Sequence, residues 1–271
     1  MGMDRREFLK LAGITTIAGL SGLTASTVLR NSLSEATQFS PDPKALTGKR
    51  WAMVIDVSKF GSDEDYAKVI SACHRIHNVP NVTDRAPDLE IKWIWKETYE
   101  HAFPGQYVSE QEHEYLEEGL RHKPFIVHCN HCDNPPCVRV CPTKATYKRP
   151  DGIVMQDMHR CIGCRFCMAG CPFGARSFNF YDPRPYIKEM NMEYPTRTKG
   201  VVEKCTFCFE RLAVGLKPAC AEASNGAMVF GDLKDPKSEV RELLRANYSI
   251  RRKPELGTLP SVFYIVGGKN A

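Results

Sequence analysis

Eight cysteines lie in two short runs near the middle of the chain. The second run has the spacing C-x2-C-x2-C-x3-C followed by proline, and the first differs only by two extra residues before its third cysteine. Thiolates at such short spacings can reach one metal centre together, and the proline after each run offers no competing backbone amide. The runs therefore predict metal binding. Their members are Cys129, Cys132, Cys137 and Cys141 in the first run and Cys161, Cys164, Cys167 and Cys171 in the second.

This spacing resembles that of bacterial two-cluster ferredoxins, in which three cysteines of a run hold one [4Fe–4S] cluster and the fourth ligates the other cluster. Because neither run is complete alone, cluster assembly and folding should be coupled. The pattern predicts cluster one on Cys129, Cys132, Cys137 and Cys171, and cluster two on Cys161, Cys164, Cys167 and Cys141.

Structural zinc is the main alternative, since C-x2-C pairs are common in zinc knuckles. A zinc knuckle has no need of a third cysteine close by and a fourth before proline, and here both features occur twice. A disulfide framework is disfavoured because many of these cysteines are only three positions apart, which is too close for easy bridging. We therefore favour iron–sulfur clusters for both runs.

The composition limits the other functions open to the chain. Its 271 residues allow one or two domains with a sizeable core, and a net charge of +5 with both signs mixed does not indicate nucleic-acid binding. Basic residues crowd the cysteine runs, where they either offset the negative charge of the clusters and raise their potentials or form a solvated face. They are Arg139, Lys144, Lys148, Arg149, Arg160, Arg165 and Arg176.

The N-terminus resembles a twin-arginine export signal. Arg5 and Arg6 are followed by Phe8 and Leu9, and a weakly apolar, uncharged stretch separates Lys10 from Arg30. The sequence predicts that residues 1–36 are a signal and linker, which would remain as a membrane anchor if uncut. Export by this route would place the protein on the periplasmic, extracytoplasmic face of the cytoplasmic membrane.

The remaining elements follow from apolar periodicity and helix signals. Ser62 and Asp65 form a capping-box pattern, which predicts a helix that carries Cys73 and ends at Asn78–Pro80. Residues 182–200 are predicted to be a loop. The predicted strands are 51–57, 91–95, 152–155 paired with 175–180, 227–230 and 259–266, and two further helices are predicted at 109–121 and 238–246.

A third cysteine group consists of Cys205, Cys208 and Cys220, and the one remaining cysteine is Cys73. A [4Fe–4S] cluster needs four thiolates, so we expect Cys73 to complete cluster three. A zinc site with the same four ligands remains an alternative, as does an inert core thiol at Cys73.

Over most of residues 51–271 the chain resembles the four-cluster, ferredoxin-like subunits that accompany molybdopterin reductases and membrane quinone-reactive subunits, such as those of polysulfide, nitrite and dimethyl sulfoxide reductases. In the stretch Ser58–Cys73, which corresponds to the first cysteine run of that family, only Cys73 is a cysteine. Ser224 stands where the last cysteine of the fourth run would be. In the family's exchange scheme these losses remove one whole cluster, so the resemblance implies three clusters.

Within that family the resemblance is closest to the exported iron–sulfur subunit of the dissimilatory sulfite-reduction transmembrane complex, also called the heterodisulfide-reductase-like menaquinol oxidoreductase. It is carried by residues 129–137, 142–145, 159–167 and 230–236. It implies a multi-pass quinone-reactive membrane subunit and a multihaem cytochrome c, or another redox subunit, as partners.

The leading hypothesis is an electron-transfer subunit that contains three [4Fe–4S] clusters, has no small-molecule substrate and serves anaerobic respiration linked to sulfite reduction. The alternative within the family is an electron-transfer beta subunit of a molybdopterin-dependent reductase or hydrogenase. A catalytic iron–sulfur enzyme would need a cluster with only three cysteine ligands, and a zinc-stabilised binding module would be colourless.

The expected fold is α+β, with tandem ferredoxin-like halves of which one lacks a cluster. Residues 124–185 would form the two-cluster domain, residues 48–80 and 200–271 the degenerate half with one cluster, and residues 81–123 an insertion.

Overall fold

The computed structural model describes residues 42–82, 89–104 and 123–266. From Lys44 onward the chain forms one compact unit. The predicted signal segment, residues 1–36, and the predicted helix at 109–121 lie outside the described residues. In the parts of the chain that are described, no helix combines the length and the apolar character needed to cross a membrane.

The largest sheet is built around β1 (Trp51–Asp56), a strand predicted from its apolar, β-rich sequence. β1 pairs antiparallel with β8 (Met228–Asp232) and parallel with β10 (Val262–Ile265), and β10 pairs antiparallel with β9 (Ser249–Ile250). The predictions of strands near 227–230 and 259–266 are therefore confirmed. Five of the six residues of β1 are buried, so both faces of the sheet are covered.

One face of this sheet is covered by α11 (Glu239–Ala246). Val240 of this helix is fully buried with Ala52 and Val54 of β1, and Leu243 and Leu244 pack against the same cluster. Their spacing predicted this apolar face. On the opposite face, Trp51, Met53 and Ile55 belong to the main core, which also contains five of the cysteines.

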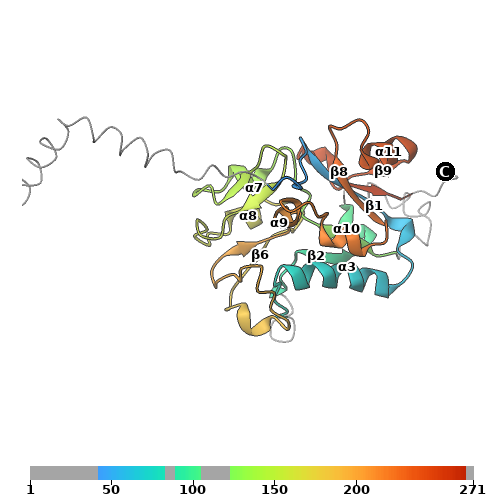
Figure 1. The fold of residues 1–271 in the computed structure, drawn as a ribbon. Coiled ribbons are helices and arrows are strands. Elements are labelled where there is room, and N and C mark those ends of the chain that lie inside the picture. Colours follow the sequence, from blue (N-terminus) through green and yellow to red (C-terminus); the bar gives the residue numbers. More distant parts are fainter. Residues whose placement is uncertain (1–41, 83–88, 105–122, 267–271) are drawn as a thin grey trace, which may run out of the picture. The chain divides into compact units, whose positions relative to one another are not determined.

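The helix that carries Cys73 is α3 (Asp63–Ile76). The predicted capping box is present, because the Ser62 side chain accepts from the Asp65 amide and the Asp65 carboxylate accepts from the Ser62 amide. The buried stripe of Tyr66, Val69 and Cys73 has helical spacing. α3 packs against α10 (Ala219–Ala223), which brings Cys73 beside the third cysteine group, and Figure 1 shows these two helices together.

Short two-stranded sheets accompany the cysteine runs. β2 (Ile94–Glu97) pairs with β3 (Phe125–His128), β4 (Thr146–Lys148) with β5 (Val154–Gln156), and β6 (Ser177–Phe178) with β7 (Val202–Glu203), all antiparallel. β2 begins at Ile94, three residues later than predicted. At Lys92 the backbone amide instead donates to the Ser177 hydroxyl, 2.7 Å away.

The predicted pairing of strand 152–155 with strand 175–180 is wrong. β5 instead forms a local hairpin with β4, closed by the Arg149 amide donating to the Ile153 carbonyl at 2.8 Å and by Gly152 at φ +85. A tight turn of this kind fixes a strand pair at little loop-closure cost. β6 instead pairs with β7. The two strands lie on either side of residues 182–200, which contain only one short helical turn.

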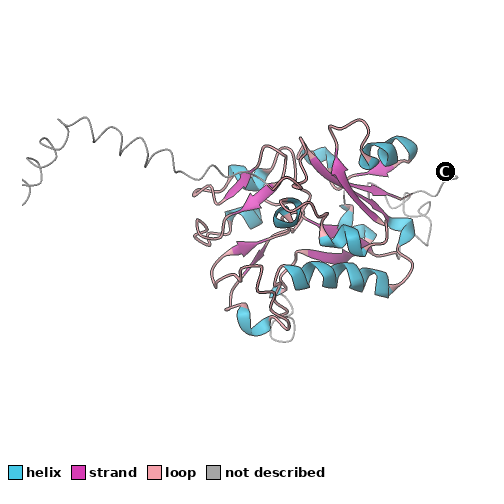
Figure 2. Cartoon of the chain, viewed as in Figure 1, coloured by secondary structure: helices cyan, strands magenta, loops and turns pink. Residues whose placement is uncertain are grey.

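The remaining elements are single turns of helix connected by loops, as Figure 2 shows. They are η1 (Val57–Lys59), α4 (Tyr99–Ala102), α7 (Pro136–Arg139), α8 (Phe166–Ala169), η4 (Arg184–Tyr186), α9 (Phe209–Leu212) and η5 (Pro254–Leu256).

Candidate metal centres

Three cysteines of the second run and the last cysteine of the first run line one cavity. Cys161 and Cys164 lie in the loop before α8, Cys167 lies on α8, and Cys141 follows α7. The cavity between these four thiols is also lined by Ile162 and Arg165. The crossover predicted from the spacing therefore has a matching geometry at this centre.

A second group gathers Cys129, Cys132, Cys137 and Cys171. The pKa of Cys132 is raised to about 12, by burial first and then by negative charge on Cys129, Cys137 and Cys171. The pKa of Cys171 is raised for the same reasons, by burial first and then by Cys129 and Cys137. Cys171 thus lies with three cysteines of the first run.

The third group consists of Cys73, Cys205, Cys208 and Cys220, all of which are buried. Burial raises the pKa of Cys73 well above its ordinary value, and the negative charges of Cys208, Cys205 and Cys220 add to this effect. Ionised groups influence one another this way only at short range in a shared, water-poor site. The structure therefore brings Cys73 to the third group.

Ser224, which stands where the resemblance expects the last cysteine of the fourth run, takes part in ordinary packing. The Ser224 hydroxyl donates to the Ala221 carbonyl at 2.7 Å and accepts from the Met228 amide at 2.9 Å, so it ties α10 to β8. In the stretch before Cys73, Phe60 stacks on Tyr66 with ring centroids 4.8 Å apart. Both segments are therefore stabilised by ordinary packing contacts.

All three thiol groups fit a [4Fe–4S] cluster in their donor chemistry. In the first and third groups, buried thiols that raise each other's pKa are costly to ionise together unless cationic metal offsets their charge, and iron would do so. Backbone amides also point at sulfur: Thr146 N–H donates to Cys141 at 3.4 Å, and Phe207 N–H donates to Cys205 at 3.5 Å. Such donors stabilise ionised cluster ligands.

Of the seven basic residues that the sequence places around the two cysteine runs, Arg176 alone is buried, and the other six are exposed or half-buried. Burial alone would lower the pKa of Arg176, but the thiolates of Cys137, Cys167 and Cys129 outweigh burial and raise it. Its guanidinium also donates to Gln156 Oε1 at 2.9 Å and to Thr146 Oγ1 at 3.2 Å. Arg176 therefore lies between the first two thiol groups. Of the two roles predicted for the basic residues, offsetting the negative charge of the clusters fits Arg176, and forming a solvated surface does not.

A second buried cation, Lys204, was not singled out by the sequence. Its ammonium donates to the carbonyls of Val154 and Cys205, the latter at 2.7 Å. Its charge lowers the pKa of Cys205, although burial and the neighbouring thiolates dominate and raise it. The sequence offered one indication of this role, which is that Lys204 directly precedes Cys205. Nothing in the sequence shows that this lysine is buried.

The histidines near the runs serve packing. His128 Nδ1 lies 2.9 Å from the Cys129 carbonyl, and His131 Nδ1 accepts from the Val154 amide at 3.1 Å. His131 also stacks on Phe207 with centroids 3.7 Å apart, whereas His159 is fully exposed. His128 and His131 therefore have packing roles, and His159 lies at the surface.

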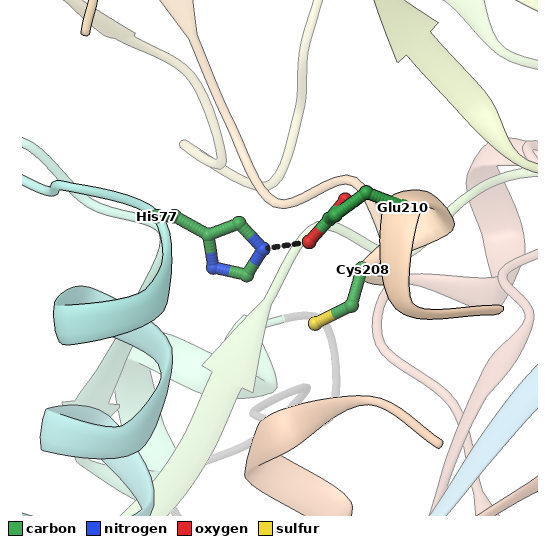
Figure 3. A group of neighbouring side chains, drawn as sticks. All are labelled: His77, Cys208 and Glu210. Carbon is green, nitrogen blue, oxygen red and sulfur yellow. Dashed lines mark hydrogen bonds and ion pairs between the residues drawn. The ribbon is translucent and has the colours of Figure 1, made fainter. Parts of the chain in front are cut away.

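The histidine nearest the third group is His77, which sequence reasoning missed. Its Nε2 lies 2.8 Å from Glu210 Oε1, and ligand atoms of His77, Glu210 and Cys208 all lie within 4.8 Å of one another (Figure 3). These three could hold a metal ion, but Cys208 also belongs to the third thiol group. The signal available was position: His77 is four residues after Cys73, and Glu210 is two after Cys208.

Comparison with known proteins agrees with this geometry. The profile of the 4Fe-4S dicluster domain family matches residues 122–233. Over 290 aligned residues the chain is 41% identical to the Hdr-like menaquinol oxidoreductase iron-sulfur subunit 1 of Archaeoglobus fulgidus, covering 98% of this chain and 100% of that protein. The protein belongs to this family of iron–sulfur subunits.

Other members of the iron–sulfur subunit family are more distant or match in part. The menaquinone reductase iron-sulfur cluster-binding subunit of Nitratidesulfovibrio vulgaris is 36% identical, over 80% of this chain and 88% of that protein. A polysulfide reductase chain of Wolinella succinogenes is 40% identical, over 51% of this chain and 64% of that protein. The predicted family, and the prediction of an iron–sulfur electron-transfer subunit of an oxidoreductase complex, are confirmed.

Proposed function

We propose that the chain conducts electrons through three [4Fe–4S] clusters and has no catalytic site of its own. The observation that carries this proposal is the meeting of Cys73 with Cys205, Cys208 and Cys220, because it sorts all twelve cysteines into three groups of four. No cluster is then left with an open iron, which a catalytic iron–sulfur enzyme would need.

The proposed ligands are those of the sequence pattern. Cluster one is held by Cys129, Cys132, Cys137 and Cys171, cluster two by Cys161, Cys164, Cys167 and Cys141, and cluster three by Cys205, Cys208, Cys220 and Cys73. Each cluster would supply a site that gains and loses one electron. The role of this chain's residues is to hold the clusters, exclude water and set the charge around them.

The proximity of the thiols supports the order three, one, two along the electron path. Burial is the main cause that raises the pKa of Cys205, a cluster-three ligand, and negative charge on Cys129, a cluster-one ligand, is the second. Cys137 of cluster one acts in the same way on Cys167 of cluster two. Cluster one is therefore the middle cluster, and clusters two and three are the ends where electrons enter or leave.

The family relatives support the choice of partners. Two of them are named as subunits of a menaquinol oxidoreductase and a menaquinone reductase, so we propose a multi-pass, quinone-reactive membrane subunit as one partner. A multihaem cytochrome c is proposed as the other, in a complex for anaerobic respiration linked to sulfite reduction. Export by the twin-arginine route would place this complex on the periplasmic side, and the two ferredoxin-like halves would correspond to residues 124–185 and to 48–80 with 200–271.

An electron-transfer role in a molybdopterin-dependent reductase is the second candidate. It is supported by the 46% identity to a putative dimethyl sulfoxide reductase iron-sulfur subunit of Halobacterium salinarum, over about half of each protein: 51% of this chain and 53% of that one.

The test is iron counting and EPR spectroscopy of the purified protein against Cys73→Ser. We expect the variant to lose cluster three and keep clusters one and two, because the other eight thiols are untouched. Ala72→Ser, which places the same side chain one position away on α3, should keep all three clusters. An unchanged iron content and EPR spectrum in Cys73→Ser would contradict the assignment.

A further inference from the structure

The cluster-two end of the proposed path is the end nearest to solvent. Of the twelve cysteines, Cys164 alone is exposed, and the cluster-two ligands Cys141 and Cys161 are partly exposed. By contrast, all four ligands proposed for cluster three are buried. Electron tunnelling weakens steeply with distance, so a partner that contacts the chain at cluster two has the shortest path to it.

Three large apolar side chains that neighbour the cluster-two cysteines in the sequence are exposed. Ile162, between Cys161 and Cys164, is 67% exposed, and Phe166, between Cys164 and Cys167, is 60% exposed. Val140, next to Cys141, is 39% exposed and packs against the end of α8, since a Cβ on Gly170 would lie 3.1 Å from its side chain. Apolar surface gathered in this way is typical of interaction sites.

The charged side chains without an ion pair that flank these residues in the sequence are cationic. Arg139, Lys144 and Arg165 are exposed, and none of them has an ion pair with a carboxylate in the described part of the chain. Arg165 lies over the rings of Phe178 and Phe180, 5.4 and 5.6 Å from their centroids. The nearby carboxylate of Asp157 is already paired with Arg160 at 3.2 Å.

The loop that presents Ile162 is held in place by a close backbone contact. Gly163 has φ +71, and a Cβ there would lie 2.4 Å from the Gly200 carbonyl oxygen. Only glycine fits such a position. Ile162 and Arg165 also line the cavity between the four thiols, so one layer of side chains separates the proposed cluster from a bound partner.

We propose that these six residues, Val140, Ile162, Phe166, Arg139, Lys144 and Arg165, form a docking face for an acidic redox protein. This inference rests on the proposed function and adds the chemistry of the partner: an apolar contact around its redox centre, ringed by carboxylates. One electron leaves cluster two, which is oxidised, and enters the partner's cofactor, which is reduced. A lipid surface suits the charge but contains no group that accepts the electron.

The experiment uses two small redox proteins of opposite charge as electron acceptors. The dithionite-reduced holoprotein is mixed in a stopped-flow instrument with oxidised rubredoxin, which is acidic, or with oxidised mitochondrial-type cytochrome c, which is basic. The second-order rate constant is followed against ionic strength. With rubredoxin, the rate should fall as salt is added, because attraction between the two proteins is screened.

Charge reversal of the docking face should reverse this preference. Arg139→Glu, Lys144→Glu and Arg165→Glu together should slow rubredoxin about 10- to 100-fold at low salt and speed cytochrome c, as expected for electrostatically steered encounters. The matched control is Lys68→Glu, Lys188→Glu and Lys237→Glu, which changes the net charge equally at exposed positions elsewhere. Ile162→Ser with Phe166→Ser should slow both acceptors without changing the salt dependence.

Iron counting and EPR on each sample separate this inference from the proposed function. If all three clusters are present and the two triple variants change the rubredoxin rate equally, the proposed docking face is refuted. The proposed function is not affected by that result. Loss of binding to anionic phospholipid vesicles in the first triple variant, with an unchanged rubredoxin rate, would assign the face to the membrane and also overturn the proposal.

Discussion

Arg176 should set the reduction potentials of clusters one and two, and its replacement by methionine is the sharpest test of the buried charges. The guanidinium is buried, and negative charge on Cys137 and Cys129 of cluster one and on Cys167 of cluster two raises its pKa. A positive charge stabilises the reduced, more negative state of a cluster. Its removal should therefore lower the potentials of both.

The size of the effect follows from Coulomb's law. Two unit charges about 4 Å apart interact by about 4 kcal/mol at an effective dielectric constant of about 20, and by about half as much at twice the distance. A factor of ten in an equilibrium corresponds to about 1.36 kcal/mol, or to about 59 mV for one electron. Arg176→Met should therefore lower the potentials by about 90–170 mV.

The assay is a redox titration followed by EPR on the wild type, Arg176→Met and Arg176→Lys. Lysine keeps the charge and should retain most of the wild-type potential. Thr146 and Gln156 still bond each other at 2.7 Å, so the methionine variant leaves both groups satisfied. Cluster three should not shift, because no cluster-three thiol is among the strongest influences on Arg176. Unchanged potentials in Arg176→Met, or an equal drop in Arg176→Lys, would refute the reasoning.

Three further results are expected. Arg197→Met should lower the free energy of unfolding by about 3–5 kcal/mol in urea melts, because it leaves Glu203 buried without the ion partner that now lies 2.6 Å away; Lys199→Met, at an exposed site, should have little effect. Ser62→Ala should cost about 1 kcal/mol through the lost capping box, measured by the same melts, and a change as large as that of Arg197→Met would contradict a purely local role. Burial lowers the pKa of His74 and of His128 from 6.5 to about 4. Both therefore stay neutral in the folded chain while the unfolded chain protonates, so stability should be full above pH 6.5 and fall toward pH 4, by at most about 3 kcal/mol per histidine. The check is a series of urea melts, each at one pH between about 7 and 4, with iron release followed separately. Equal midpoints throughout this series would contradict the prediction.

Local signals in the sequence predicted the elements that they control. The capping box at Ser62, the apolar run of β1 and the helical spacing of Val240, Leu243 and Leu244 each depend on neighbours within a few residues, and each was found. Cysteine counting rests on a different reason, and its result, a third cluster on Cys73, Cys205, Cys208 and Cys220, stays a prediction that the proximity of these thiols supports. A cluster needs four thiolates, so the single leftover cysteine, Cys73, was expected to join the one incomplete group.

Features that depend on long-range packing were missed. The pairing of β6 with β7 joins residues on either side of 182–200, and no local pattern chooses between it and a pairing with β5. The burial of Lys204, and the approach of His77 to Glu210 across 133 positions, likewise depend on how distant elements meet. Polar residue types alone gave no reason to place them beside a cluster.

The parallel pairing of β1 with β10 bears on how the protein is made. Met53 lies opposite Val262, so β1 lacks its neighbour on that side until more than two hundred further residues have left the ribosome. Contacts between segments so far apart in sequence form slowly and late. All twelve cysteines precede β10 in the chain, so every thiol has been synthesised before the strand that completes this side of the sheet.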